Sequence, residues 1–424
     1  MTKLIFKYWD IQAVTVFPFD TIQDYSVVLT PEHEMFRKAV REFVEREVAP
    51  RAMEIEEKDE VPHDVLKKMA EQGFFGIGIP EKYGGQGGDH RMAAIMSEEI
   101  CRVLPGLSVY IGTNELFLTP IMLFGSEEQK QKYIPPIAKG EKFGAFAVTE
   151  PCCGSDVAGI QTKAEKVGNK WVINGRKAFI SSADVADYFI VLARTYPPPD
   201  KRLRYLGLTF FIVEKDTPGF RVEQCYHKMG LYGDHACELV FENVEVPDEN
   251  RVGEEGMGFL YAMETFDRTR IGVAAQAVGM AQAAFEMAFK YVHQRQAFGV
   301  PIAYFQAIQF SLVEMMAKIF TARLLTYLAA KLADENRKEY TFVASLAKFY
   351  ATEVAEEVIS EAINLHGGVG VIREKGVELF LRSVKITQIY EGANNIQKLV
   401  AYRQLIRILR EKGQIPEEVA KLVT

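Results

Sequence analysis

The spacing of apolar residues changes twice along the chain, and each change marks a different kind of predicted element. From residue 29 to 145, apolar positions recur every three to four residues, beginning after the capping pair Thr30-Pro31, as in amphipathic helices. From residue 146 to 253 the runs are short or alternating and are separated by turn sequences such as Asn174-Gly175, which is typical of antiparallel strands. Residues 254–424 return to long helical repeats, which suit a bundle of antiparallel helices.

The pattern therefore predicts an α+β protein with an N-terminal helical domain, a central antiparallel β domain and a C-terminal helical domain at these three ranges. Residues 1–28 are rich in aromatic side chains and are interpreted as an extension of unknown role. Strands are expected at Lys170–Asn174, Tyr188–Leu192, Leu208–Val213, Phe220–Val222 and Glu238–Val246. Long helices are expected at Phe259–Arg295, Gln306–Asn336, Thr341–Leu365, Lys375–Ile389 and Asn395–Leu409.

Composition narrows the class of function only slightly. The chain has 424 residues and a net charge of −7, which disfavours a nucleic-acid-binding protein because such proteins usually carry a basic excess. No apolar run approaches the ~20 residues needed to span a membrane. The five cysteines lack the spacing of metal ligands, so we expect reduced thiols in a cytoplasmic enzyme.

The strongest chemical signal is a glutamate on a short loop between two helical segments. The nine residues from Ile389 to Gln397 read IYEGANNIQ, with Glu391 followed by Gly392. A glycine beside a carboxylate lets a ligand approach the backbone closely while the side chain acts as a base. Taken alone, the same segment is equally consistent with a helix–helix turn whose glutamate caps the next helix.

A second segment, far away in sequence, favours a functional interpretation of the Glu391 loop. Residues 146–156 read FAVTEPCCGSD, which by itself could be a strand end followed by a turn. Together the two segments resemble the acyl-CoA dehydrogenase family of flavoenzymes. Further matches at 174–182, 267–270, 294–308 and 364–370 follow in the family's order, so the resemblance extends over residues 29–410.

This resemblance implies a fold, a cofactor and partners. The family fold has a helical N-terminal domain and a C-terminal four-helix bundle that pack around FAD, with the β domain between them. Members desaturate an acyl-CoA thioester between Cα and Cβ, pass electrons to an electron-transfer flavoprotein and usually form homotetramers. We therefore expect a cytoplasmic oxidoreductase of fatty acid β-oxidation.

By the same resemblance, Glu391 is the base that removes the α-proton while a hydride passes from Cβ to the flavin. The Glu391 backbone N–H would hold the thioester oxygen, and burial beside an apolar acyl chain should raise the pKa of the carboxyl. The family carries its base on this loop or on an earlier helix, at a position that we match to Arg270. A loop glutamate with arginine on the helix resembles the short- and medium-chain members.

The resemblance also implies which residues bind the cofactor. Some contact the flavin ring and others hold its ADP portion, which in the family lies across a subunit interface. Phe179 and Ser181 stand where tryptophan and threonine are common, and both swaps keep a ring and a hydroxyl. The expected FAD-binding residues are Phe146, Val148, Thr149, Ser155, Phe179, Ser181, Arg295, Phe298, Gln306, Asn364, Gly367, Gly368, Ala393 and Asn395.

The acyl-CoA substrate would contact a separate set of positions. Cations among them suit the phosphates of CoA, and Ser155 would lie near these phosphates or the flavin. The expected substrate-binding residues are Ser155, Asp267, Thr269, Arg270, Gly392, Arg403 and Glu115. Glu115 is the unusual member, because it is either a solvent-facing helix residue or a second pocket carboxylate for a polar, cyclic or conjugated acyl group.

Two other functions remain open from the sequence. An acyl-CoA oxidase shares this half-reaction but gives its electrons to oxygen, and such chains are usually much longer. A non-catalytic CoA- or flavin-binding relative would be expected to lose Glu391, which is present here. No arginine lies between Tyr110 and Pro120, which disfavours a dicarboxylate substrate of the glutaryl type.

Overall fold

The computed structural model describes residues 25–416, and its contacts divide the chain into two compact units. The first unit holds the described residues up to Lys58, His90–Pro105 and the residues from Arg270 onward. The second unit holds Asp59–Asp89 and Gly106–Thr269. The boundaries of the three sequence-predicted domains stay predictions. Most of the predicted N-terminal extension lies outside the described residues.

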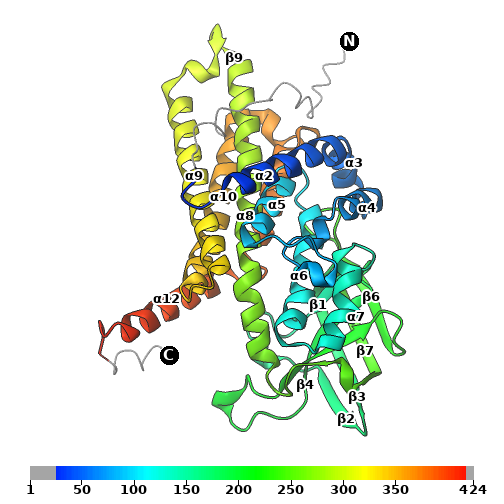
Figure 1. Cartoon of the computed structure of the whole chain (residues 1–424). Coiled ribbons are helices and arrows are strands. Elements are labelled where there is room, and N and C mark those ends of the chain that lie inside the picture. The colour runs from blue at the N-terminus through cyan, green and yellow to red at the C-terminus, as the bar shows by residue number, and fades with distance from the viewer. Residues whose placement is uncertain (1–24, 417–424) are drawn as a thin grey trace. The chain divides into compact units, whose positions relative to one another are not determined.

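The first unit is helical and contains most of the long helices that the periodicity predicts (Figure 1). The helices α9 and α10 pack along each other, and α11 and α12 pack on α10. Their shared core is rich in buried alanines, which let helix axes approach closely. Its helices are α2 (Pro31–Phe43), α3 (Ala49–Lys58), α5 (His90–Cys101), α9 (Gln306–Asp334), α10 (Tyr340–His366), α11 (Val377–Thr387) and α12 (Asn394–Glu411), with α8 (Gly258–Gln294) entering from the second unit.

Buried charges tie the helices of the first unit together. Glu98 on α5 accepts from Arg323 Nε at 2.9 Å and from Tyr327 Oη at 2.6 Å, both on α9. Arg37 on α2 donates to the same carboxylate at 3.3 Å. Tyr25, which the sequence analysis left in an extension of unknown role, is buried here and accepts from Arg323. Because each charge has a partner, the network can stay buried.

The second unit contains one large mixed sheet together with α4 (His63–Glu71), α6 (Leu107–Phe124) and α7 (Glu127–Ala138). The strands lie in the order β6-β7-β3-β2-β4-β5-β8, and β1 pairs with β4. Most pairs are antiparallel as expected, but β1 and β2 each run parallel to β4. The strands are β1 (Gly144–Ala147), β2 (Lys163–Val167), β3 (Lys170–Ser181), β4 (Tyr188–Arg194), β5 (Leu208–Glu214), β6 (Phe220–Tyr226), β7 (Ala236–Pro247) and β8 (Arg251–Val252).

One described helix, α6, is long and apolar enough by length and composition to cross a membrane. In the folded chain 61% of its apolar window is buried, as in the core helix of a globular protein. Its Phe117 and Ile121 lie in the core beside the sheet. Glu115 is half-buried on this same helix, so both predicted alternatives for this residue, a solvent-facing position and a second pocket carboxylate, stay open.

Candidate active site

The loop that carries Glu391 has a backbone conformation that few residues adopt. It joins α11 to α12, with φ of +50° at Glu391 and +92° at Gly392. Left-handed φ is costly for a residue with a side chain and persists where the surroundings enforce it. The φ at Gly392 is one that L side chains rarely adopt, and a Cβ there would also displace the side-chain amide of Gln397, so glycine is strongly favoured at this position.

Two polar side chains from neighbouring helices hold the loop carbonyls. Gln397 Nε2 on α12 donates to the carbonyl oxygens of Glu391 and Gly392, both at 3.1 Å. Lys348 Nζ on α10 donates to the Gly392 carbonyl at 2.8 Å and to Asn394 Oδ1 at 3.1 Å. Just before the loop, the Tyr390 hydroxyl donates to Gln276 Oε1. These bonds account for the strained backbone at Glu391.

Arg270 supports the same loop, a contact that the sequence did not predict. It is only 4% exposed, and its Nη1 donates to Ser345 Oγ at 2.7 Å and to Gln397 Oε1 at 3.0 Å. Arg270 is therefore a loop-supporting residue, and its predicted place in a channel for CoA stays a prediction. Thr269 is also buried, and its hydroxyl donates back to the Thr265 carbonyl.

Lys348, Gln397 and Asn394 were missed by the sequence analysis, which named the exposed Asn395 instead of its neighbour. A signal for Lys348 was available. It shares a helix face with Ala344, Ala347 and Ala351, all of which are buried. A lysine on such a small apolar face at i, i+3 and i+4 spacing is rarely tolerated without a polar partner.

In the second unit, the segment that follows β1 is anchored to β3. Glu150 accepts from Lys177 Nζ at 2.9 Å and from the backbone N–H groups of Gln161 and Thr162 at 2.6 and 3.0 Å. Burial raises the pKa of Glu150, but Lys177 and these donors outweigh burial and lower it overall. Burial lowers the pKa of Lys177 to about 8 despite the attraction of Glu150. The Thr149 carbonyl accepts from Ala178 N at 2.9 Å, which fixes the predicted flavin segment.

Phe179 lies in a β-bulge, and this explains its orientation. The register between β3 and β7 shifts between Lys177 and Ile180, and Phe179 has φ of +59°. Bulges re-aim side chains and often occur beside functional sites. The ring is 62% exposed and packs against Tyr226, with centroids 4.9 Å apart. An open aromatic surface followed by the Ser181 hydroxyl fits the ring of a flavin.

The predicted ADP-binding residues gather at the far ends of α8 and α10. Phe298 stands at the turn between β9 (Gln296–Ala297) and β10 (Val300–Pro301) and is 94% exposed. Arg295 precedes this turn, and its N–H donates to the Tyr291 carbonyl. The Tyr291 ring stacks on His366 at 4.6 Å, which brings the α8 end next to Gly367 and Gly368. His366 is buried, and burial lowers its pKa, as expected of a packing residue.

The remaining predicted residues differ in their exposure. Ser155, Gln306, Asn364, Asn395 and Arg403 are exposed, whereas Val148 is buried. Phe146, Thr149, Asp267, Gly392 and Ala393 are half-buried. The Val148 carbonyl accepts from Lys177 at 3.0 Å, and Asn364 Nδ2 donates to Glu361 at 3.1 Å. Exposure and these two hydrogen bonds do not test binding, so the binding roles of these residues stay predictions.

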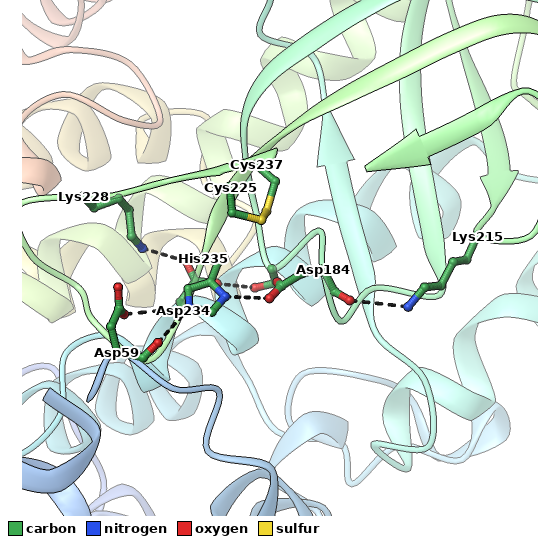
Figure 2. The surroundings of a disulfide bond; sticks show 9 residues. Asp59, Asp184, Lys215, Cys225, Lys228, Asp234, His235 and Cys237 are labelled. Carbon is green, nitrogen blue, oxygen red and sulfur yellow. Dashed lines mark hydrogen bonds and ion pairs between the residues drawn. A yellow bond between two sulfur atoms is a disulfide. The ribbon is translucent and has the colours of Figure 1, made fainter. Parts of the chain in front are cut away.

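The expectation of five reduced cysteines is wrong for one pair. Cys225 and Cys237 are register partners on β6 and β7 and form a disulfide (Figure 2). Cys101, Cys152 and Cys153 are free thiols. The pairing was missed because it depends on strand register, which the 12-residue separation alone does not give. The thiol argument for a cytoplasmic location therefore fails for this pair.

A polar cluster lies next to the disulfide in the second unit. Figure 2 shows Lys228 directed toward Asp234, and His235 placed between Asp59 and Asp184. The buried Asp234 accepts from Ser182 Oγ at 2.7 Å and from Lys228 Nζ at 3.0 Å. The hydrogen bond to Asp184 raises the pKa of His235 to about 9. The cluster fixes the segment that leads into β7.

Comparisons with known proteins agree with this arrangement. Three family models match in order: the acyl-CoA dehydrogenase N-terminal domain at residues 30–141, the middle domain at 145–244 and the C-terminal domain at 256–406. The chain therefore belongs to the acyl-CoA dehydrogenase family. It is an oxidoreductase of a family whose members are FAD-dependent flavoproteins that desaturate acyl-CoA thioesters.

Individual relatives are similar over almost their whole length. The chain is 43% identical over 378 residues, 89% of this chain and 98% of the relative, to the CarC subunit of a caffeyl-CoA reductase–Etf complex from Acetobacterium woodii. It is 42% identical over 379 residues, 89% and 99%, to a 3-(aryl)acrylate reductase from Clostridium sporogenes. The butyryl-CoA dehydrogenase structure from Megasphaera elsdenii superposes with a TM-score of 0.86 at 39% identity, covering 91% of this chain and all of that one.

Proposed function

We propose that Glu391 removes the α-proton of a short- or medium-chain, or cyclic, acyl-CoA thioester and so drives its conversion to the 2-enoyl-CoA. The observation that carries this proposal is the loop conformation of Glu391. The backbone of this left-handed glutamate is held by Gln397 and Lys348 through the loop carbonyls. Such preorganisation is what a positioned general base requires.

Other residues bind and orient the substrate and cofactor in this proposal. Bound FAD supplies the acceptor for the hydride that leaves Cβ. The Thr149 and Ser181 hydroxyls donate to the flavin ring, and Phe179 packs on it. The Glu391 backbone N–H donates to the thioester oxygen as negative charge develops there. Asp267 and Arg403 bind CoA.

We further propose an electron-transfer flavoprotein as the electron acceptor and a second copy of the chain as a partner. The name of the Acetobacterium relative includes such a flavoprotein complex. Several apolar side chains near the α8–α9 turn are open to solvent, among them Phe298 at 94%, Tyr304 at 73% and Phe310 at 61%. A patch of this kind marks an interface, and a homotetramer would cover it. Native mass spectrometry that finds only monomers would contradict this part of the proposal.

A second candidate function is the reverse reaction, reduction of an aryl-conjugated enoyl thioester. It is favoured by the names of two relatives at 43% and 42% identity, which concern caffeyl-CoA and 3-(aryl)acrylate reduction. Bound FAD, reduced by two electrons from the electron-transfer flavoprotein, would supply the hydride to Cβ. The same base would then act as an acid and deliver the proton to Cα, because the forward and reverse reactions pass through one transition state. Glu115, half-buried on the apolar helix α6, suits a polar substituent on such an acyl group.

The test is an anaerobic visible spectrum of the purified flavoprotein, titrated with butyryl-, octanoyl-, cyclohexanecarbonyl- and 3-phenylpropionyl-CoA. Bleaching of the flavin band by one thioester would establish reaction class and substrate size together. The Glu391→Gln variant should bind flavin and acyl-CoA yet lose bleaching by several orders of magnitude, because an amide does not accept the α-proton. Substantial bleaching by this variant would remove Glu391 from its role.

A further inference from the structure

Lys348 is a fully buried cation whose hydrogen-bond partners are both uncharged. It is 0% exposed on α10, and its ammonium donates to the Gly392 carbonyl and to Asn394 Oδ1. Burying an ammonium group costs several kcal/mol, and a methionine would pack the same helix face without that cost. A packing role alone therefore does not explain a lysine at this position.

The two partners of Lys348 flank the turn that carries Glu391. Gly392 directly follows the glutamate, and Asn394 is the first residue of α12. Asn394 is held in turn by Thr352, whose hydroxyl lies 3.2 Å from Asn394 Oδ1. Lys348 thus joins α10 to the loop and to the start of the following helix, and it shares the Gly392 carbonyl with Gln397 of α12. Loss of the ammonium removes one of the two hydrogen-bond donors to the Gly392 carbonyl.

The charge of Lys348 also acts on Glu391. Burial lowers the pKa of Lys348 to about 7, and the attraction of Glu391 opposes this decrease. The other charged groups that face the ammonium are Arg270, which lowers its pKa, and Glu353, which raises it. The attraction is mutual, so the protonated ammonium favours the ionised form of Glu391.

We propose that Lys348 is a positioning residue for the desaturation reaction: it fixes the backbone of the Glu391 turn through the Gly392 carbonyl and stabilises the Glu391 carboxylate. This inference rests on the proposed role of Glu391 as the base. In this role Lys348 acts through the loop and through its charge on Glu391, not as a catalytic residue.

The test compares Lys348→Met, Lys348→Gln and Lys348→Arg with Lys318→Met as the matched control. Lys318 also contacts α10, from α9 through a 2.6 Å ion pair with Glu357, but it does so at the surface. For each holoenzyme the flavin content, the Kd for acyl-CoA and the anaerobic bleaching rate are measured from pH 6 to 9. The best thioester from the panel described above serves as the substrate.

We expect Lys348→Met and Lys348→Gln to retain flavin and to bind acyl-CoA within about threefold, while the bleaching rate falls roughly 10- to 100-fold. The pH of half-maximal rate should move upward, because removal of a nearby cation raises the pKa of a carboxylate. Lys348→Arg should recover part of the rate. Lys318→Met should match the wild type within about twofold.

The outcomes separate this inference from the proposed function. If Glu391→Gln still bleaches, the base assignment fails first. If Glu391→Gln is inactive but Lys348→Met and Lys348→Gln keep the wild-type rate and pH profile, the inference about Lys348 is overturned alone. An equal loss of flavin, binding and rate without a shift in pH profile would mean that Lys348 only stabilises the fold. If Lys348→Met does not fold, Lys348→Gln and Lys348→Arg still decide through the pH profile.

Discussion

Two buried lysines, one in each unit, show how the same residue type serves different ends. Lys177 on β3 and Lys348 on α10 are both 0% exposed. Lys177 pairs with the buried carboxylate of Glu150 at 2.9 Å, whereas Lys348 meets only carbonyl and amide oxygens. Lys177 therefore neutralises its own partner and holds a segment rigid. The charge of Lys348 instead acts on Glu391, the proposed base of the reaction.

The largest effect that would test this comparison is on stability. Lys177→Met leaves the Glu150 carboxylate buried without its cation, so we expect a loss of about 3–5 kcal/mol in the free energy of unfolding. Lys348→Met orphans only neutral acceptors and should cost about 1–3 kcal/mol. Denaturant titrations measure both. The double variant Glu150→Gln/Lys177→Met should regain part of the loss, and equal costs for the two single lysine variants would remove the distinction.

The disulfide offers a smaller effect confined to the region of Lys177. Replacing Cys225 and Cys237 by serine removes the covalent link between β6 and β7. We expect a loss of about 2–3 kcal/mol in the free energy of unfolding under oxidising conditions. The bleaching rate should stay within about twofold of wild type, because neither cysteine is among the residues proposed to bind the substrate or the cofactor. Added dithiothreitol should abolish the stability difference between wild type and variant. A difference that survives reduction would show that serine itself perturbs the strands.

The pH-dependent contributions of the two lysines to the free energy of unfolding should differ by about 1–2 kcal/mol. The folded pKa is about 7 for Lys348 and about 8 for Lys177, whereas an unfolded lysine titrates near about 10.4. Between these values the unfolded state binds more protons, so each lysine raises stability as pH increases. The advantage of wild type over Lys348→Met should begin to grow near pH 7, and that over Lys177→Met near pH 8. Denaturant titrations at pH 6.5, 7.5 and 9 locate each onset, and coincident onsets would contradict the assignment.

The smallest effect concerns Glu115, a half-buried group that belongs to neither loop nor strand. Glu115→Gln should change the bleaching rate with straight-chain thioesters by less than about threefold, because their acyl groups offer it no polar partner. A larger change with an acyl group that carries a phenolic hydroxyl would place Glu115 in the acyl pocket. Equal effects on both substrate classes would remove it from the pocket.

Elements and motifs were predictable from the sequence wherever the signal is local. The predicted helix at Gln306–Asn336 is observed at Gln306–Asp334, and the predicted strand at Leu208–Val213 is observed at Leu208–Glu214. The Glu391 loop was placed correctly between two helices because glycine and a change of periodicity mark it. Helix and strand periodicity are local properties of the chain.

Features that depend on tertiary pairing were not predictable in the same way. The Cys225–Cys237 bond requires the register of β6 against β7, and the parallel pairing of β1 with β4 joins segments about forty residues apart. The support that Arg270 gives to the Glu391 loop was not predicted, because the sequence does not tell which neighbours bury a side chain. Its partners Ser345 and Gln397 come from α10 and α12, far along the chain.

The helix α10 runs unbroken from Tyr340 to His366 and carries Lys348 near one end and the stacked His366 at the other. A helix advances ~1.5 Å and turns by about 100° per residue, so its 27 residues span about 40 Å and fix both the distance and the angle between the two ends. Insertion of one residue in its middle would keep every side chain chemically intact. It would nevertheless rotate Lys348, whose ammonium holds the loop, by about 100° relative to His366, which stacks on Tyr291. The count of residues in this helix is thus as strongly specified as their identity.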